Sequence, residues 1–352
     1  MKLRNAYCSY SAFEEIYTFN EDYPELYKIL SKHCSLTIDL SEDELEKRIF
    51  KSPVLKSFYK ESGKINTKPE IFEQVPDKID FANYPGSLFI VDVPEKECEA
   101  IRKKFGVLTI SSKEMNRFTS LVSPAVPWSW TSGDTKTYSC PTGKTYKGWG
   151  AILRPFTCTQ PLSAANLIIN DAYIFQSDDI EIIADNIFSL TKGFLSDNLK
   201  GEMQVLIVGG SSKKGQPDFY INSATIDKIF GKLNSLKAAI QHCNVRFGIL
   251  TYEIDNFKFS DLHERFIIAD YSICTSHYGF LEFIEEKAQR SNDLNYQWSY
   301  YNVCNNNGSD IPLKKMQTKL QAIEELRKLN QTMKSTSTHF HRGHTDNRLL
   351  NL

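Results

Sequence analysis

The sequence has few of the features that identify membrane proteins, zinc-binding proteins or strongly basic nucleic-acid-binding proteins. No run approaches the ~18 apolar residues needed to span a bilayer, and the first residues lack the apolar stretch of a signal peptide. Its eight cysteines include no C-x2-C pair, which argues against a structural zinc site. The formal net charge is −1, so a nucleic-acid site would have to be a local basic groove. We therefore expect a cytoplasmic protein with reduced cysteines.

The composition is that of a globular protein with room for two cores. Of 352 residues, 41% are hydrophobic and 24% are charged. The alternation of apolar segments predicts an α/β architecture, in which a mixed sheet covered by helices follows a smaller α/β domain. We place the smaller domain at residues 1–122 and the larger at 151–334, with a connection at 123–150 and a polar tail at 335–352.

The connection and the tail each leave two alternatives. The connection is rich in Pro, Ser, Thr and Gly and contains Trp128, Trp130 and Trp149, so it is either a packed loop or a recognition surface, and we favour packing. The tail has three histidines within six residues, which could bind metal in a purified sample. A disordered basic tail accounts for it more simply.

The N-terminal part contains a strand, a helix and a second strand at residues 88–93, 95–105 and 106–111. Pro94 before the helix and Gly106 after it fit the usual preference for Pro at helix starts and Gly beyond helix ends. If the two strands pair in parallel, the connection is a right-handed crossover. This pattern resembles the last half of a PIN-type nuclease domain.

That resemblance would require carboxylates that converge on a metal ion. The candidates are Asp39, Asp43, Glu44 and Asp92. The alternative, which we favour, is that Ser41 caps a helix whose first turn carries the acidic residues. We therefore expect no metal and no cofactor.

In the second half, apolar strands alternate with helix-length amphipathic segments. We expect strands at 166–175, 205–208 and 245–251 and helices at 180–199 and 226–243. This alternation is typical of a covered sheet that is largely parallel or mixed. A regular apolar stripe from 311 to 333 predicts a further helix, which either caps the second domain or forms a dimer or partner helix.

The segment with the most chemical content is Leu-His-Glu-Arg-Phe-Ile-Ile-Ala-Asp at residues 262–270. In a strand, His263 and Arg265 would share one face, and the apolar run would lead to Asp270 at the strand's end. An imidazole, a cation and a carboxylate are the groups that a phosphodiester site needs. The alternative is an edge-strand histidine beside a surface arginine in an ordinary α/β sheet.

These residues resemble the HKD motif of the phospholipase D superfamily, with Arg265 in place of its lysine. Two further elements support the resemblance: Asp171-Ala172-Tyr173 is similar to a D-P-Y turn, and the segment at 275–283 lies where the superfamily has G-S-x-N-F. The sequences H-E-R-F and S-H-Y-G-F-L-E are closer to a divergent branch with H-D-R-[FY] and G-H-G-F-[DE]. The resemblance covers residues ~150–310.

The resemblance implies a role for each candidate residue. His263 would attack phosphorus while His277 protonates the leaving group, unless a second copy of the chain supplies that histidine by dimerisation. Arg265 would clamp the phosphate, and Asp270 or Glu282 would orient an imidazole. The remaining candidates, assigned to substrate binding, are Asp171, Tyr173 and Ser276.

Three functions follow from these residues. The first is a phospholipase D-like protein that acts on or holds nucleic acid, as a metal-independent nuclease within a prokaryotic defence-type complex. The second is a non-catalytic module that binds a partner protein or an anionic headgroup. It is favoured by Arg265, which is a good phosphate clamp but cannot release a proton in water. The third is an assembly protein that works through its C-terminal helix and acidic N-terminal half.

Overall fold

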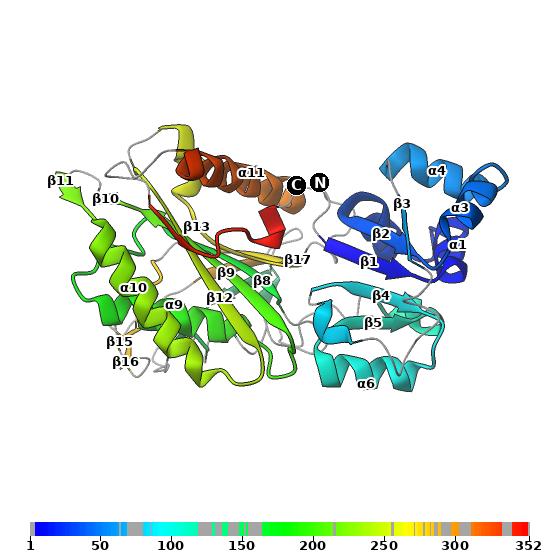
Figure 1. Cartoon of the computed structure of the whole chain (residues 1–352), viewed down its shortest axis with the longest axis horizontal. Helices are drawn as coiled ribbons and strands as arrows, with labels where there is room; N and C mark the ends of the chain where they lie inside the picture. Colours follow the sequence, from blue (N-terminus) through cyan, green and yellow to red (C-terminus); the bar gives the residue numbers. More distant parts are fainter. Residues whose placement is uncertain are drawn as a thin grey trace.

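The computed structural model describes two sheets, each covered by helices (Figure 1). The α/β class predicted from the sequence is confirmed. None of the described helices is long and apolar enough to cross a membrane. The description covers residues 4–62, 65–68, 80–84, 86–118, 129–130, 136–139, 148–150, 153, 164–213, 216–254, 257–270, 272–276, 279–281, 283–284, 288–289, 297–302, 311–332 and 340–350.

The smaller sheet is wholly parallel. Its strands lie in the order β3 (Ile65–Thr67), β2 (Cys34–Ile38), β1 (Arg4–Cys8), β4 (Leu88–Val91) and β5 (Leu108–Ser111). One face packs against α1 (Tyr10–Thr18), α3 (Glu42–Ile49) and α4 (Pro53–Ser62), and the other against α6 (Glu95–Phe105). Shorter elements complete this part: α2 (Pro24–Lys28), η1 (Ile29–His33), η2 (Phe81–Asn83) and η3 (Ser112–Arg117).

Local sequence signals explain the helix ends in this half. Ser41 and Glu44 form a reciprocal capping box at the start of α3, so the N-cap interpretation is confirmed. Helix α6 spans the predicted residues and ends at Gly106, whose φ of 65° is readily adopted only by glycine. Strands β4 and β5 on either side of α6 are parallel, as the crossover requires.

The larger sheet is mixed, as predicted. Its order is β18 (His341–Gly343), β12 (Asn244–Tyr252), β9 (Glu202–Gly210), β8 (Asn166–Asn170), β13 (Arg265–Ala269), β14 (Ser272–Ser276), β17 (Gln297–Asn302), β7 (Lys136–Ser139) and β6 (Ser129–Trp130). Strands β8, β9 and β12 are parallel, and the other pairs are antiparallel. Two separate hairpins are formed by β10 (Ser212–Lys213) with β11 (Gln216–Tyr220) and by β15 (Phe283–Ile284) with β16 (Ala288–Gln289).

Helices cover both faces of this larger sheet (Figure 1). On one face lie α9 (Ile180–Phe194) and α10 (Ser223–Leu236), the latter continued by η4 (Lys237–Ala239). On the other face lies α11 (Ile311–Thr332), whose apolar stripe is buried against the sheet. The buried residues Met316, Leu320, Ile323 and Leu326 agree with the interpretation that this helix caps the second domain, and a dimer or partner role for it stays a prediction.

Two described strands from the segment predicted as a connection join the larger sheet. Strand β7 pairs with β17, and β6 pairs with β7. Trp149 is fully buried, and its Nε1–H donates to Asn186 Oδ1 (3.1 Å) and to the Phe280 carbonyl (2.9 Å). The prediction of packing is confirmed for Trp149, and the described strands β6 and β7 of the predicted connection are part of the larger sheet. Trp128 lies outside the described residues.

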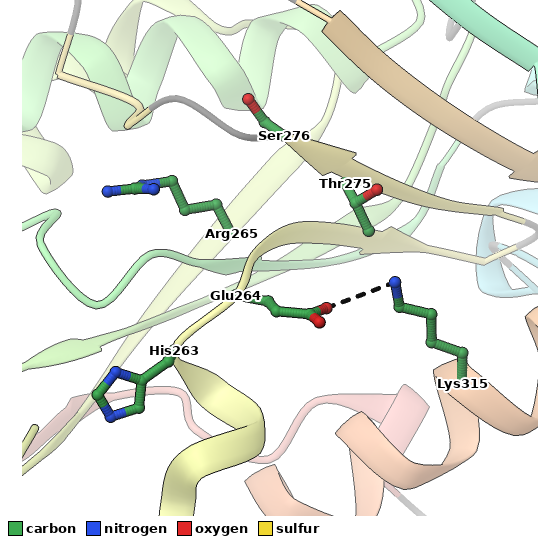
Figure 2. A pocket seen from close by; sticks show the side chains of 6 residues that line it. All are labelled: His263, Glu264, Arg265, Thr275, Ser276 and Lys315. Atoms are coloured by element: carbon green, nitrogen blue, oxygen red, sulfur yellow. Dashed lines mark ion pairs between the residues drawn. The ribbon is translucent and has the colours of Figure 1, made fainter.

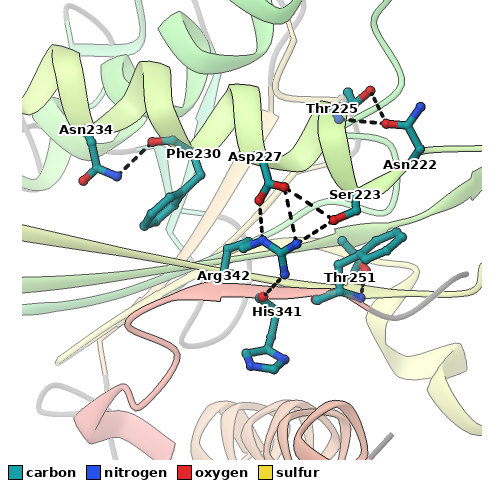
Figure 3. Close-up of polar contacts among 10 residues, drawn as sticks. Asn222, Ser223, Thr225, Asp227, Phe230, Asn234, Thr251, His341 and Arg342 are labelled. Atoms are coloured by element: carbon teal, nitrogen blue, oxygen red, sulfur yellow. Dashed lines mark hydrogen bonds and ion pairs between the residues drawn. The ribbon is translucent and has the colours of Figure 1, made fainter. Parts of the chain in front are cut away.

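The prediction of a disordered tail is wrong for residues 340–350. This segment adds β18 to the edge of the sheet, and Arg342 forms an ion pair with Asp227 on α10 (Figure 3). Phe340 and Thr251 exchange hydrogen bonds of 2.7 and 3.0 Å, and Leu349 and Leu350 of η6 (Arg348–Leu350) are buried. The polar sequence conceals this role because its few apolar residues follow no helix or strand period.

A glycine in β12 makes room for the C-terminal segment. A Cβ atom on Gly248 would lie 2.1 Å from the His344 carbonyl oxygen. We expect Gly248→Ala to lower the free energy of unfolding by about 2 kcal/mol or more, because backbone must move to relieve the clash. Urea denaturation and limited proteolysis of the C-terminal segment would measure this.

The matched control is Gly231→Ala in α10, where a Cβ would meet nothing within 4 Å. That change should leave the protein equally or slightly more stable, since alanine favours helix over glycine. Equal stability of the two variants would show that residues 340–350 do not pack against β12 as described.

Candidate functional site

The candidate site is a pocket where β13 begins and β14 ends (Figure 2). It has a volume of about 230 Å³. Arg265, the first residue of β13, pairs with Ser276, the last of β14. The lining residues are His263, Glu264, Arg265, Thr275, Ser276 and Lys315.

His263 lies just before β13, not on it, after the short helix η5 (Phe257–Leu262). Its Nε2 lies 2.6 Å from the Ile254 carbonyl oxygen, which can only accept, so Nε2 carries a proton. In the neutral ring, Nδ1 then holds the lone pair. The predicted strand position is wrong, yet His263 and Arg265 do line the same pocket.

Arg265 is held by the turn that follows β8. Its Nε lies 3.3 Å from Asp171 Oδ1, and its guanidinium carbon lies 5.3 Å from the centre of the Tyr173 ring. Asp171 is 1% exposed and accepts the N–H groups of Tyr173 and Phe280, both at 2.9 Å. Asp171 and Tyr173 therefore position Arg265, and for the buried Asp171 this replaces the predicted role in substrate binding.

Burial changes the pKa of Asp171. It raises the pKa of this carboxyl, although the Tyr173 N–H and Arg265 act in the opposite direction. A Cβ on Gly279 would lie 3.5 Å from Asp171 Oδ2 and 3.6 Å from Arg265 Nε, so the chain after β14 passes close to this pair. His277 and Glu282 lie outside the described residues.

The opposite wall of the pocket comes from α11, which the sequence analysis did not assign to the site. Glu264 Oε2 lies 2.9 Å from Lys319 Nζ and 3.4 Å from Lys315 Nζ. Lys319 is buried, and its ammonium also donates to the Asp261 carbonyl (3.2 Å) and lies 4.5 Å from the centre of the Phe266 ring. Lys315 is more exposed and reaches the pocket. The sequence did contain one indication of this wall: the two lysines are four residues apart on a predicted helix and therefore lie on one face of it.

The pKa values of these groups reflect burial and charge together. Burial lowers the pKa of the Lys319 ammonium, opposed by Glu264. Partial burial acts to raise the pKa of Glu264, but Lys319 and Lys315 outweigh it and lower that pKa. Glu264 therefore stays ionised and neutralises part of the positive charge on this wall.

Asp270 lies beyond the end of β13 that is far from His263, so it does not orient that imidazole. It accepts the N–H groups of Ala165 (2.6 Å) and Asn166 (3.1 Å) and the Asn166 side-chain amide (2.6 Å). The five residues of β13 place it at the far end of the strand, roughly 16 Å from its start at ~3.3 Å per residue. Asp270 therefore has a structural role: it holds the backbone of Ala165 and Asn166 at the start of β8.

The N-terminal carboxylates do not form a metal centre in the part of the chain that the structure describes. Asp39 follows β2 and accepts the Tyr10 N–H at 2.6 Å, and Asp92 follows β4 and accepts the Ser11 hydroxyl. Burial raises the pKa of Asp39, and the charge of Asp92 adds to this shift. Asp43 and Glu44 lie in the first turn of α3.

No protein-family model and no curated protein matches this chain. The function has to be inferred from the pocket itself. His263, Arg265 and Lys315 line this pocket together with the hydroxyl-bearing residues Thr275 and Ser276. Two cations and an imidazole with neighbouring hydroxyls form a set of donors suited to the oxygens of a phosphate group.

Proposed function

We propose that this pocket binds a phosphodiester group and that the protein is a divergent phospholipase D-like protein that acts on or holds nucleic acid. The observation that carries the proposal is that His263, Arg265 and Lys315 all line one pocket. Arginine offers a planar fork of N–H donors to phosphate oxygens, and lysine adds a compact positive charge. The setting in a prokaryotic defence-type complex depends on the family resemblance alone.

The pocket also offers a route for cleavage without metal. In this proposal Nδ1 of His263 forms a bond to phosphorus while the bond to the leaving oxygen breaks. A second acid, for which we propose His277, gives that oxygen a proton. Water then hydrolyses the phosphohistidine and restores the imidazole. Arg265 and Lys315 would offset the negative charge on the phosphate oxygens.

A non-catalytic binding module remains the second candidate, and two contacts favour it. Arg265 is already paired with Asp171, which makes it a fixed clamp. Among the described residues, His263 contacts a backbone carbonyl through its ring and no carboxylate. Such a module would hold nucleic acid, an anionic headgroup or a phosphorylated partner through the same donors.

Cleavage assays with labelled single- and double-stranded DNA and RNA in EDTA would test the proposal. We expect metal-independent cleavage that His263→Ala abolishes, with an unchanged melting temperature, because His263 is only partly buried. His341→Ala, at an exposed histidine on β18, is the matched control and should retain full activity.

Binding of the same oligonucleotides, followed by fluorescence anisotropy, separates the two candidates. Lys315→Ala should weaken binding and reduce the slope of log affinity against log salt by about 1. Lys314→Ala, at an exposed neighbour on α11 outside the pocket, should leave both unchanged. Binding without cleavage would favour the module, and the absence of both would overturn the proposal.

A further inference from the structure

A groove in the smaller domain is lined by residues of α3, α4 and strand β3. Its volume is about 400 Å³, larger than that of the pocket at His263. The lining residues are Glu42, Leu45, Glu46, Ile49, Tyr59, Ile65, Asn66 and Thr67. None of these residues takes part in the proposed phosphodiester site.

The groove lies at β3, the outer described strand on this side of the smaller sheet. All three residues of this strand line it, although successive side chains in a strand point to opposite faces. A cavity that meets both faces lies beside the strand or at its end. Strand β3 is the last of the described strands on this side of the sheet, so among them only β2 pairs with it.

The backbone of β3 presents hydrogen-bonding groups to this groove. The Lys68 N–H donates to the Ile38 carbonyl (3.0 Å), so Lys68 directs its N–H toward β2. In a parallel pair, residues that bond to the neighbouring strand alternate with residues that point away. Ile65 and Thr67 therefore direct their N–H and C=O groups away from β2, toward the groove.

The opposite wall is a single stripe of α3. Glu42, Leu45, Glu46 and Ile49 are spaced by three, one and three residues, which places them on one face of the helix. Leu45 is 5% exposed and contributes to the base of the groove, as does the buried Ile65. Glu42 and Glu46 are exposed and form the rim. The groove thus combines an apolar base, an acidic rim and an edge of β3 that no other described strand covers.

We propose that this groove binds an extended, basic segment of a partner protein, which adds to the sheet as a strand beside β3. An incoming strand would bond to the outward N–H and C=O groups of Ile65 and Thr67. Its aliphatic side chains would contact Leu45 and Ile65, and its Lys or Arg side chains would meet Glu42 and Glu46. The same carboxylates repel a phosphate backbone, which disfavours nucleic acid as the occupant.

The probe for this site is a set of hexapeptides in which Val, Ile or Tyr alternates with Lys or Arg. Fluorescence anisotropy with the full-length chain should show binding by members of this set, and not by the same peptides with Glu in place of Lys and Arg. N-methylation of alternate backbone amides should abolish binding, because it removes the donors that pair with β3.

A charge reversal on α3 localises the interaction. Glu46→Lys should weaken peptide binding about tenfold, since it replaces attraction with repulsion. Asp43→Lys is the matched control: it is an exposed carboxylate on the same helix outside the groove, and it should leave binding unchanged. Neither substitution removes a buried contact, so both variants should fold.

Three results would overturn the proposal. The basic peptides could bind no better than the acidic ones, N-methylation could have no effect, or Glu46→Lys and Asp43→Lys could weaken binding equally. A concentration-dependent dimer that Glu46→Lys dissociates would instead assign the groove to a second copy of this chain. Because the groove and the phosphodiester pocket lie in different domains, oligonucleotide binding should be the same in Glu46→Lys and in wild type.

Discussion

Replacement of Arg265 by alanine should weaken oligonucleotide binding roughly 30-fold or more and should also destabilise the fold. The loss of affinity follows from the loss of the charge-assisted donors that face a phosphate. The loss of stability follows because the carboxyl of Asp171, which is 1% exposed, loses the guanidinium 3.3 Å away. Removal of one partner of such a pair costs about 3 kcal/mol. Anisotropy and urea denaturation would measure the two effects.

The destabilisation should depend on pH in a defined direction. Burial already raises the pKa of Asp171 above its ordinary value of 3.8, so the folded protein holds this proton more tightly than the unfolded chain does. A carboxyl whose pKa is raised by folding contributes its whole stabilisation at pH values below its pKa in the unfolded chain. This contribution is lost as the pH rises toward its pKa in the folded protein. Arg265 opposes the shift, so its removal raises the pKa of Asp171 in the folded protein further. The pH range over which stability is lost then extends to higher pH. The stability difference between Arg265→Ala and wild type should therefore be larger at pH 7.5 than at pH 4.

A second arginine–carboxylate pair provides the control. Arg342 and Asp227 join β18 to α10, but Asp227 is exposed to solvent. Arg342→Ala should therefore have little effect on stability and none on oligonucleotide binding. If the two arginine variants are equally stable at both pH values, Asp171 does not depend on Arg265 as described.

The sequence predicted the elements of the fold where local physics determines them. The apolar runs that became β9 and β12, the capping box of α3 and the stripe of α11 each depend on residues close together in the chain. The order of the strands within each sheet depends on contacts between residues far apart in the chain. The sequence therefore predicted that order less well. Nothing local shows that residues 340–350 return to pair with β12, because that pairing depends on space at Gly248, almost a hundred residues earlier.

The candidate site was predicted in part for the same reason. The motif predicted that His263 and Arg265 lie together, and both line one pocket, but the contact of Asp171 with Arg265 was not predicted. The wall formed by Lys315 lies fifty residues further along the chain, and no motif connects the two segments. Asp270 was assigned to the imidazole because motif spacing measures distance along the chain, whereas an extended strand keeps its two ends apart.

Asp270→Ala should destabilise the protein by about 3 kcal/mol or more and leave oligonucleotide binding by the folded molecule unchanged. The substitution removes the acceptor of three N–H groups from Ala165 and Asn166, and the carboxylate is only 1% exposed. Asp270→Asn should also destabilise, because one of its two oxygens becomes an NH₂ donor that faces other donors. Thermal unfolding gives the stability, and anisotropy well below the melting temperature gives the affinity.

Asp270 also lies where the two domains meet, which gives the prediction a second consequence. A Cβ atom on Gly86 of the smaller domain would lie 3.1 Å from both carboxylate oxygens of Asp270, and Gly86 has a φ of +71°. Gly86→Ala should therefore destabilise through strain and through this contact, in the same direction as Asp270→Ala. The double variant should lose less than the sum of the two single losses, because both substitutions disrupt one contact. Lost oligonucleotide binding by Asp270→Ala at an unchanged melting temperature would instead return Asp270 to the phosphodiester site.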